Sequence, residues 1–464
     1  MKIVVLNGSP KGDLSVTIQY VHFIQNNYPQ HELKIINIAQ RIQAIEKTEE
    51  TFEEIINDIR SSDGILWAFP LYFLLVHSHY KRFIEIIFER NIIEAFKDKY
   101  TAALSTSIHF YDHTAHNYIN SICDDLGMKY LGYFSADMAD LMIEKKRKEL
   151  ILFAEHLFRS IENNVPTKKN FQPLVNRQFE YIPGEVETTV DVDNKKVLVL
   201  TDSTDNQTNL GKMVERFSQS FSQKIELINL NDVDIRGGCL GCIQCGYDNT
   251  CAYGDKDGYM EFFNTKVKKA DIIIFAGTIK DRYLSSRWKL FFDRSFFNNH
   301  TPVLIDKQVG FIISGPLSQI PNLRQIFEAW FELQLCNLVD FITDEIEDSA
   351  QIDNLLSNLA ERLLRYQKEN YVKPMTFLGI GGMKIFRDDI YGRIRFPFRA
   401  DHKFYQKYGL YDFPQKNYKV RITSTIMTLL TKIPSVRKEI YERRIKTEMI
   451  KPFQKVLMHN ERVN

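Results

Sequence analysis

Four of the six cysteines lie within thirteen residues, in a C-x2-C-x2-C-x5-C run. Thiolates this close together suit one shared soft metal centre. Zinc ribbons and fingers use two separated knuckles, whereas three cysteines at this short spacing with a fourth nearby are typical of cubane iron–sulfur sites. The run therefore predicts an iron–sulfur cluster, and a structural zinc or a set of reactive thiols remain the alternatives. The predicted metal ligands are Cys239, Cys242, Cys245 and Cys251.

A second chemical feature is the segment Gly8–Thr17, where an apolar run ends and a helical pattern begins. Open backbone N–H groups and the positive end of a helix favour an anion at such a junction. The hydroxyls of Ser9, Ser15 and Thr17 would add donors. The segment lacks the G-K-S/T of a Walker A loop and the G-x-G-x-x-G of a dinucleotide site, so we expect a phosphate loop of another kind.

Two further loops, Phe69–Phe73 and Ser105–Tyr111, each follow an apolar run. A doubly wound parallel sheet binds its ligands at the C-terminal ends of its strands, so these loops should border the same ligand as the phosphate loop. Both are rich in aromatic residues and backbone donors, which suit a flat ring.

Five of the eleven histidines fall in two short loops. They could hold a metal, cap or hydrogen-bond the loops, or act beside a bound ring. In the last role, His109 or Tyr111 could hydrogen-bond the ring or protonate a substrate, because neutral histidine titrates near working pH. The five are His77, His79, His109, His113 and His116.

The elements that must position these residues occur twice. Short continuous apolar runs alternate with amphipathic helical patterns, which predicts parallel βαβ units with both sheet faces covered. Residues 2–9 resemble 196–203, 63–69 resemble 271–276, and 101–106 resemble 309–314. The offset grows from 194 to 208 residues across the interval that holds the cysteine run, so the run reads as an insertion in the second copy.

The G-S-P-K…S-x-T loop and the F-P-L-Y…K-R-F segment resemble the flavodoxin-like NAD(P)H-dependent FMN reductases. The cysteine run, followed by Asp255, Asp257 and Met260, resembles the iron–sulfur flavoproteins of that superfamily. The resemblance implies FMN, a 4Fe–4S cluster on the four cysteines, and NAD(P)H as electron donor. It implies that the FMN phosphate is held by Ser9, Lys11, Ser15, Val16 and Thr17, and that the isoalloxazine ring is bordered by Pro70, Leu71, Tyr72, Phe73, Thr106, Ser107, Ile108 and His109.

The second copy is a poorer flavin site. Its first loop carries Asp202 and Asp205, which would repel a phosphate, and its ring loop lacks a Pro-x-Tyr element. We therefore expect FMN in the first domain and the cluster in the second. In the resembling family the flavin and cluster approach each other across a dimer interface, which the fused chain would supply internally.

We expect a flavodoxin-like FMN domain over residues 1–165, a linker over 166–194, a second flavodoxin-like domain with the cysteine insertion over 195–372, and a basic, mainly helical region over 373–464. From Pro374 onward, 19 lysines and arginines stand against 8 aspartates and glutamates, while the preceding residues carry a net charge of −10. Docking on an acidic protein surface is the favoured role of the basic region. Peripheral membrane contact is an alternative, and no nucleic-acid partner is expected. The glycine-rich segment Phe377–Met383 is predicted to be a turn.

Only Cys123 and Cys336 lie outside the run, which argues for a reducing compartment. The N-terminus has no apolar core of signal-peptide length, so a cytoplasmic protein is expected. The predicted function is an oxidoreductase that passes electrons from NAD(P)H or a ferredoxin-like donor through FMN and a 4Fe–4S cluster to a small-molecule or protein acceptor. The alternatives are an FMN-dependent NAD(P)H:quinone-type reductase with structural zinc, and a non-enzymatic electron carrier or docking protein. The oligomeric state is left open, with a homodimer among the options.

Overall fold

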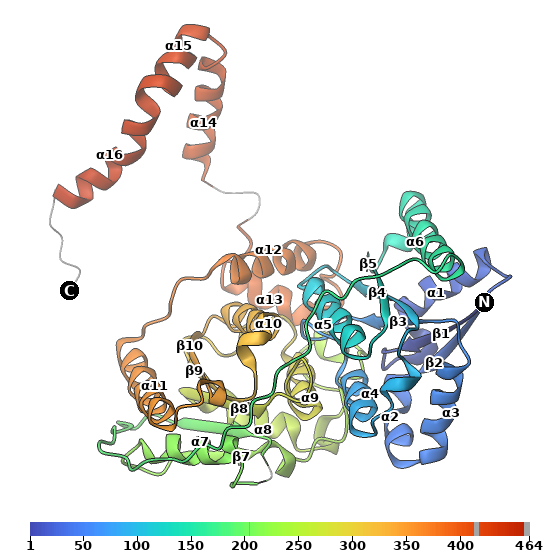
Figure 1. The fold of residues 1–464 in the computed structure, drawn as a ribbon. Coiled ribbons are helices and arrows are strands. Elements are labelled where there is room, and N and C mark those ends of the chain that lie inside the picture. The colour runs from blue at the N-terminus through green and yellow to red at the C-terminus, as the bar shows by residue number, and fades with distance from the viewer. Residues whose placement is uncertain (204, 413–416, 459–464) are drawn as a thin grey trace. The chain divides into compact units, whose positions relative to one another are not determined.

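A computed structural model describes residues 1–203, 205–412 and 417–458. Residues Met1–Tyr405 form one compact unit, and the chain from Gln406 onward forms another. The first unit contains two five-stranded parallel sheets (Figure 1). The boundary at Tyr405 leaves the first helices of the basic region within the α/β unit.

The first sheet has the strand order β2-β1-β3-β4-β5. Its strands are buried runs such as Ile3–Leu6, which are apolar on both faces because helices cover the sheet on both sides. The strands are β1 (Lys2–Asn7), β2 (Glu32–Asn37), β3 (Gly64–Pro70), β4 (Tyr100–Ser107) and β5 (Lys129–Asp137). The helices are α1 (Val16–Asn27), α2 (Ile38–Lys47), α3 (Glu49–Arg60), α4 (Ser78–Glu89), α5 (Asp112–Asp125) and α6 (Glu144–Glu162).

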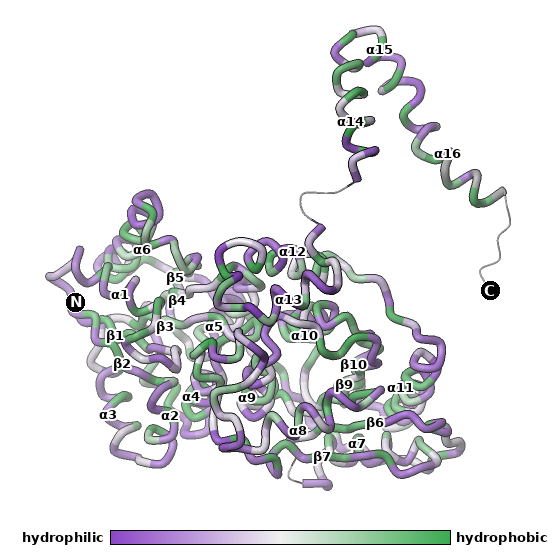
Figure 2. The backbone as a smooth tube through the Cα atoms, turned by 180° about the vertical axis from the view of Figure 1, so that it is seen from behind, coloured by the Kyte–Doolittle hydropathy of each residue, from purple (hydrophilic) through white to green (hydrophobic). Residues whose placement is uncertain are grey.

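The second sheet has the order β10-β9-β8-β6-β7, which is the order of the first sheet read from its other edge. Its strands are β6 (Val197–Thr201), β7 (Glu226–Asn229), β8 (Ile272–Thr278), β9 (Gln308–Ser314) and β10 (Asn337–Thr343). The helices are α7 (Asn209–Gln219), α8 (Tyr259–Thr265), α9 (Ser286–Ser295), α10 (Pro321–Leu333) and α11 (Ser349–Glu369). The hydrophobic colouring in Figure 2 is concentrated along the strands of both sheets. The predicted fold class, two flavodoxin-like parallel sheets with a helical C-terminal region, is confirmed.

The two α/β domains meet through α4 and α9, which lie side by side (Figure 1). The amine of Lys81 is fully buried there, 2.8 Å from Glu85 and 2.9 Å from Asp281 of the second domain. The backbone N–H of Ser286 donates to the Glu85 carboxylate over 2.6 Å. Because breaking a buried ion pair leaves an uncompensated charge, this network fixes how the two domains face each other.

The basic region is helical, with α12 (Phe377–Tyr391) and α13 (Arg399–Lys407) followed by α14 (Tyr418–Leu430), α15 (Pro434–Lys438) and α16 (Ile445–Met458). The prediction of a turn at Phe377–Met383 was wrong, because this segment begins α12. Its glycines serve packing: a Cβ on Gly382 would lie 2.6 Å from the Phe110 ring, and one on Gly379 would lie 2.8 Å from Glu332. Residues 413–416 and 459–464 of this predicted region lie outside the described residues. In the described part of the chain, no helix is both long and apolar enough to cross a membrane.

Candidate functional site

The loop between β1 and α1 is held in place by Asn7. Its side-chain amide donates to the Gly12 carbonyl over 3.2 Å and to Asn37 over 2.7 Å, while its oxygen accepts from the Ser9 backbone N–H over 3.0 Å. Ser15 is the N-cap of α1, yet its side chain makes no capping hydrogen bond. No acidic residue lies in the first turn of α1. The amides of that turn are therefore open to an anion, as a phosphate site requires.

The two predicted ring loops lie beside this helix start. The backbone N–H of Leu71 donates to the Thr106 carbonyl over 3.2 Å, which joins the loop after β3 to the end of β4. Phe73 and Leu74 have positive φ angles of 41° and 58°, an uncommon conformation for residues with a side chain. Thr17 lies behind these loops, fully buried, with its hydroxyl 2.7 Å from that of Thr106.

These loops border a cavity of about 250 Å³ at the C-terminal ends of β1, β3 and β4. The cavity offers an anion site at a helix start and a slot between apolar side chains, so the residues present fit a flavin mononucleotide. Eleven of the predicted FMN residues line it: Ser9, Lys11, Ser15, Val16, Pro70, Leu71, Tyr72, Phe73, Thr106, Ser107 and Ile108.

His109 and Tyr111 do not line this cavity. The His109 ring is about half exposed and hydrogen-bonds the Asp112 carboxylate over 2.9 Å. The Tyr111 hydroxyl donates to the backbone carbonyl of Leu378 in α12. The two predicted catalytic residues therefore lie on a predicted flavin loop but outside the lining of the cavity.

The four cysteines of the run line one smaller cavity, of about 20 Å³. Cys245 is buried, Cys239 and Cys251 are partly buried, and Cys242 is exposed. Burial, reinforced by the neighbouring thiols, raises the pKa of Cys245 to about 12. A metal centre would therefore have to displace these protons on binding.

The arrangement of the four thiols bears on which metal they suit. Four thiolates around one zinc lie roughly 4 Å apart, given the Zn–S distance of about 2.3 Å and tetrahedral geometry. Within the described residues, no three histidine, cysteine or acidic side chains converge as a single ion requires. The four cysteines line one space, and four thiolates at this spacing could serve as ligands of an iron–sulfur cluster or of a zinc ion.

The cysteine loop also forms a wall of the flavin-sized cavity. Gly241 and Ile243 line both cavities. Gly241 has a φ of +62°, and a Cβ on it would overlap the hydroxyl of Tyr72 and lie 2.9 Å from Cε of Lys11. Only glycine can bring the backbone this close in this conformation.

Two of the flagged histidines hold this loop. The ring Nε2 of His77 donates to the Cys239 carbonyl over 2.9 Å, while its Nδ1 accepts from the His79 backbone. The Gly238 N–H donates to Nε2 of His79 over 2.9 Å. Burial lowers the pKa of His77 well below its usual range, so the ring stays neutral and can serve as donor and acceptor at once. The sequence allowed metal binding, hydrogen bonding or a role beside a bound ring for His77 and His79, and the structure shows hydrogen bonding.

Sequence reasoning missed Arg294, which lines the cysteine cavity. Its guanidinium is buried, bonds both oxygens of Asp257 over 2.6 and 3.0 Å, and donates to the Gly237 carbonyl over 2.9 Å. It also lies 3.9 Å from the ring centre of Tyr253. No local pattern marks this arginine, because its partners lie 37 and 57 residues away in sequence.

Residues 1–139 match the family model described as NADPH-dependent FMN reductase. The match confirms the prediction of an NAD(P)H-dependent flavin oxidoreductase and rests on the first domain alone. A comparison with curated proteins gives no match.

Among solved structures, the chain is similar to an NADH:FMN oxidoreductase (EMOB, apo form), with 16% identity over 34% of this chain and 89% of that one, at a TM-score of 0.30. It is also similar to the flavoenzyme NAD(P)H:(acceptor) oxidoreductase FerB from Paracoccus denitrificans, with 18% identity over 35% and 97% of the two chains, at a TM-score of 0.31. The Trp repressor binding protein from Bacillus subtilis shows 21% identity over 36% and 98%, at a TM-score of 0.26. At these TM-scores the three structures support no conclusion about the function of this chain.

The second domain differs from the first domain at the matching helix start. The Thr208 hydroxyl caps α7 by accepting from the Gly211 N–H over 3.2 Å. Asp202 accepts a hydrogen bond from the Ser285 hydroxyl, so its carboxylate lies beside the loop. The first turn of α7 is thus partly satisfied by its own chain, and an anion would meet a carboxylate.

Proposed function

We propose that this chain is a flavin- and iron–sulfur-dependent oxidoreductase with FMN in the first domain and a 4Fe–4S cluster in the second. Electrons would come from NAD(P)H or a ferredoxin-like donor and go to a small-molecule or protein acceptor. One observation carries the proposal: the cavity lined by the predicted FMN residues and the cavity lined by the four cysteines share Gly241 and Ile243 as walls.

Different residues of the chain would bind the FMN phosphate, separate the two cofactors and offset the charge of the cluster. The open amides of α1 and the Ser15 hydroxyl would hold the phosphate, with the Lys11 amine as a nearby counter-charge. Bound flavin exchanges electrons in pairs or singly, and a cluster carries them one at a time. Tyr72, whose hydroxyl lies against Gly241, would stand between the two cofactors. The buried charge of Arg294 would offset part of the negative charge of four thiolates.

The shared strand order of the two sheets supports a duplication, with the cysteine run inserted in the second copy. The run also reaches the surface, because Cys242 is exposed and is flanked by the exposed Leu240 and Tyr247. That position suits a protein partner exchanging single electrons. A reducing, cytoplasmic compartment is part of the proposal, because the six cysteines are all unpaired. A homodimer stays a prediction.

Anaerobic purification followed by flavin, iron, acid-labile sulfide and zinc analysis tests the proposal. We expect one FMN with four iron and four sulfide per chain, and loss of iron but retention of flavin in C242A. Flavin with stoichiometric zinc and no sulfide would establish the quinone-type reductase alternative instead. A colourless protein that takes up neither group would establish the non-enzymatic carrier.

A further inference from the structure

The half of the large cavity away from the phosphate loop is an aromatic chamber, defined here by Phe73, Phe296, Trp330, Phe386 and Phe398. Two pairs of these rings lie close to each other. Phe73 lies 4.2 Å from Trp330 between ring centres, and Phe296 lies 6.2 Å from Phe398. Two of the five rings come from the basic region after residue 373, so that region closes the cavity and is part of the site.

The chamber favours an uncharged flat ligand. Among the described residues that line the whole cavity, Lys11 is the one lysine or arginine, and it stands at the phosphate loop. A dinucleotide or a carboxylic acid in the chamber would have no cationic partner there, and a buried unpaired charge is costly. A planar uncharged ring would instead gain contact with every wall.

Besides Lys11 and Tyr72, two titratable side chains line the large cavity: Asp293, whose carboxylate is paired with the buried amine of Lys289, and His300, which is held by the basic region. Nδ1 of His300 lies 2.7 Å from the fully buried carboxylate of Asp401 in α13, and the His300 ring centre lies 4.1 Å from that of Phe386. Asp401 also accepts from the Thr301 hydroxyl over 2.9 Å. Nδ1 of His300 is hydrogen-bonded to Asp401, and none of the described residues forms a hydrogen bond with the other ring nitrogen, Nε2. This is the base–carboxylate geometry that orients a general acid.

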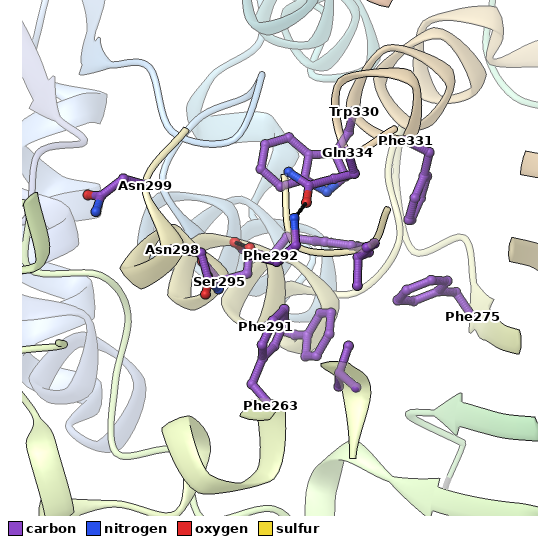
Figure 3. Close-up of a pocket in the computed structure, with 13 residues that line it drawn as sticks. Phe263, Phe275, Phe291, Phe292, Ser295, Asn298, Asn299, Trp330, Phe331 and Gln334 are labelled. Carbon is purple, nitrogen blue, oxygen red and sulfur yellow. Dashed lines mark hydrogen bonds between the residues drawn. The ribbon is translucent and has the colours of Figure 1, made fainter. Parts of the chain in front are cut away.

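The chamber also connects to the cysteine loop. Asn299 lines it and donates to the Cys245 carbonyl over 2.9 Å. Asn299 and Trp330 in addition border a second, smaller apolar cavity (Figure 3). That cavity contains no titratable side chain among its lining residues, and Asp293 is paired with Lys289, which leaves His300 as the proton donor at this end of the molecule.

We propose that the chamber binds an uncharged planar acceptor bearing a carbonyl oxygen, and that His300, held by Asp401, donates a proton to that oxygen. For a quinone the change to hydroquinone takes two electrons and two protons. Both electrons and one proton would arrive as a hydride from the reduced flavin of the function proposed above, on which this inference rests. The second proton would come from the His300 imidazolium, which becomes neutral and is reprotonated from solvent, while two C=O bonds become C–OH.

The test uses the flavin-loaded full chain, reduced by dithionite and mixed with either menadione or ferricyanide. Menadione needs protons and ferricyanide needs none. H300Q should slow menadione reduction about 100-fold and remove its pH dependence, with ferricyanide reduction and flavin content unchanged. H113Q is the matched control, because His113 lies at the surface against Gln325.

A binding measurement that needs no turnover completes the test. Menadione should quench the fluorescence of Trp330, so the quenching should be lost in W330F and kept in H300Q. If wild type oxidises with neither acceptor, the proposed function fails. If wild type reduces menadione and H300Q does so equally fast, or if quenching is the same in W330F, the inference about the chamber is overturned. Should H300Q lose its flavin, F398A decides: unchanged menadione binding refutes the chamber.

Discussion

Gly241 offers the sharpest test of how the cysteine loop meets the flavin-sized cavity. In G241A the backbone keeps a φ of +62° that an L-residue adopts at a cost of about 1–2 kcal/mol. The new methyl group would also overlap the Tyr72 hydroxyl, and forcing a group into a packed site costs about 1–3 kcal/mol. The two costs together should lower the local stability of the loop by about 2–5 kcal/mol, which raises the equilibrium constant for local opening of the loop about thirtyfold or more.

Gly254 provides the matched control. It lies in the same insertion with a φ of +53°, but nothing lies within 4 Å of its Cβ position. G254A should therefore show the backbone cost alone, about 1–2 kcal/mol. The double variant Y72F/G241A should return to that level, because the nearest remaining ring atom, Cζ, is 3.4 Å away and Cε of Lys11 ends a flexible side chain.

Hydrogen exchange of the backbone amides around residues 237–246, followed by mass spectrometry of the loaded protein, measures the local opening. G241A should exchange at least several-fold faster in this loop than G254A does in its own segment. Equal effects of G241A and G254A, or failure of Y72F to rescue G241A, would show that the cysteine loop does not pack against Tyr72. The proposal that Gly241 forms a wall between the two cavities would then be refuted.

Further predictions concern charge, binding and the C-terminal unit. Burial lowers the pKa of His116 from 6.5 to about 4. As the pH falls through this range, the unfolded chain binds a proton at His116 before the folded chain does, so the free energy of unfolding of the wild type should fall by about 3 kcal/mol. H116Q should not show this loss when both proteins are unfolded by urea at a series of pH values. R294Q leaves a buried aspartate unpaired, so it should lose about 3–5 kcal/mol of stability. If the proposed cluster is present, R294Q should also shift its midpoint to more negative potential, while R294K keeps the charge. S15A should weaken FMN binding about tenfold in fluorescence titrations, whereas T208A should not. A chain ending at Tyr405 should no longer sediment with anionic vesicles, whereas the full chain should do so in a salt-sensitive manner.

The vesicle prediction rests on the composition of the second unit. Its helices α14 and α16 alternate between hydrophobic and hydrophilic residues along the chain (Figure 2). Exposed apolar side chains such as Ile422, Leu429 and Phe453 accompany lysines and arginines. If truncation leaves vesicle binding unchanged, the unit is not the membrane contact, and docking on a protein becomes the better account of its charge.

Local patterns predicted the parts of the site that are contiguous in sequence. Alternating apolar runs and helices predicted both sheets, and the predicted flavin loops do line one cavity because strand C-termini converge at one sheet edge. The cysteine spacing predicted one shared site, and its four side chains do line one cavity. Short-range spacing was informative wherever a single loop supplies the chemistry.

Local sequence patterns could not predict contacts between segments that are distant in the chain. His300 and Asp401 are separated by 101 residues, and neither has a distinctive neighbourhood in sequence. His109 looked suitable because it follows a strand at the right edge, yet it points to Asp112 at the surface. The glycines of Phe377–Met383 suggested a turn, whereas their purpose is the close approach of a helix to Phe110. In each case tertiary packing decided the outcome.

The two helix starts show why similar domains would differ in ligand. Both α1 and α7 follow the first strand of a parallel sheet, so both present a positive helix end to the same relative place. In α7 the Thr208 hydroxyl satisfies one amide and Asp202 contributes negative charge nearby. In α1 the N-cap Ser15 leaves the amides open. The proposed division between a phosphate-binding and a cluster-binding domain would thus follow in part from which helix caps itself, and a change of a few loop residues would be enough to close the anion site in the second domain.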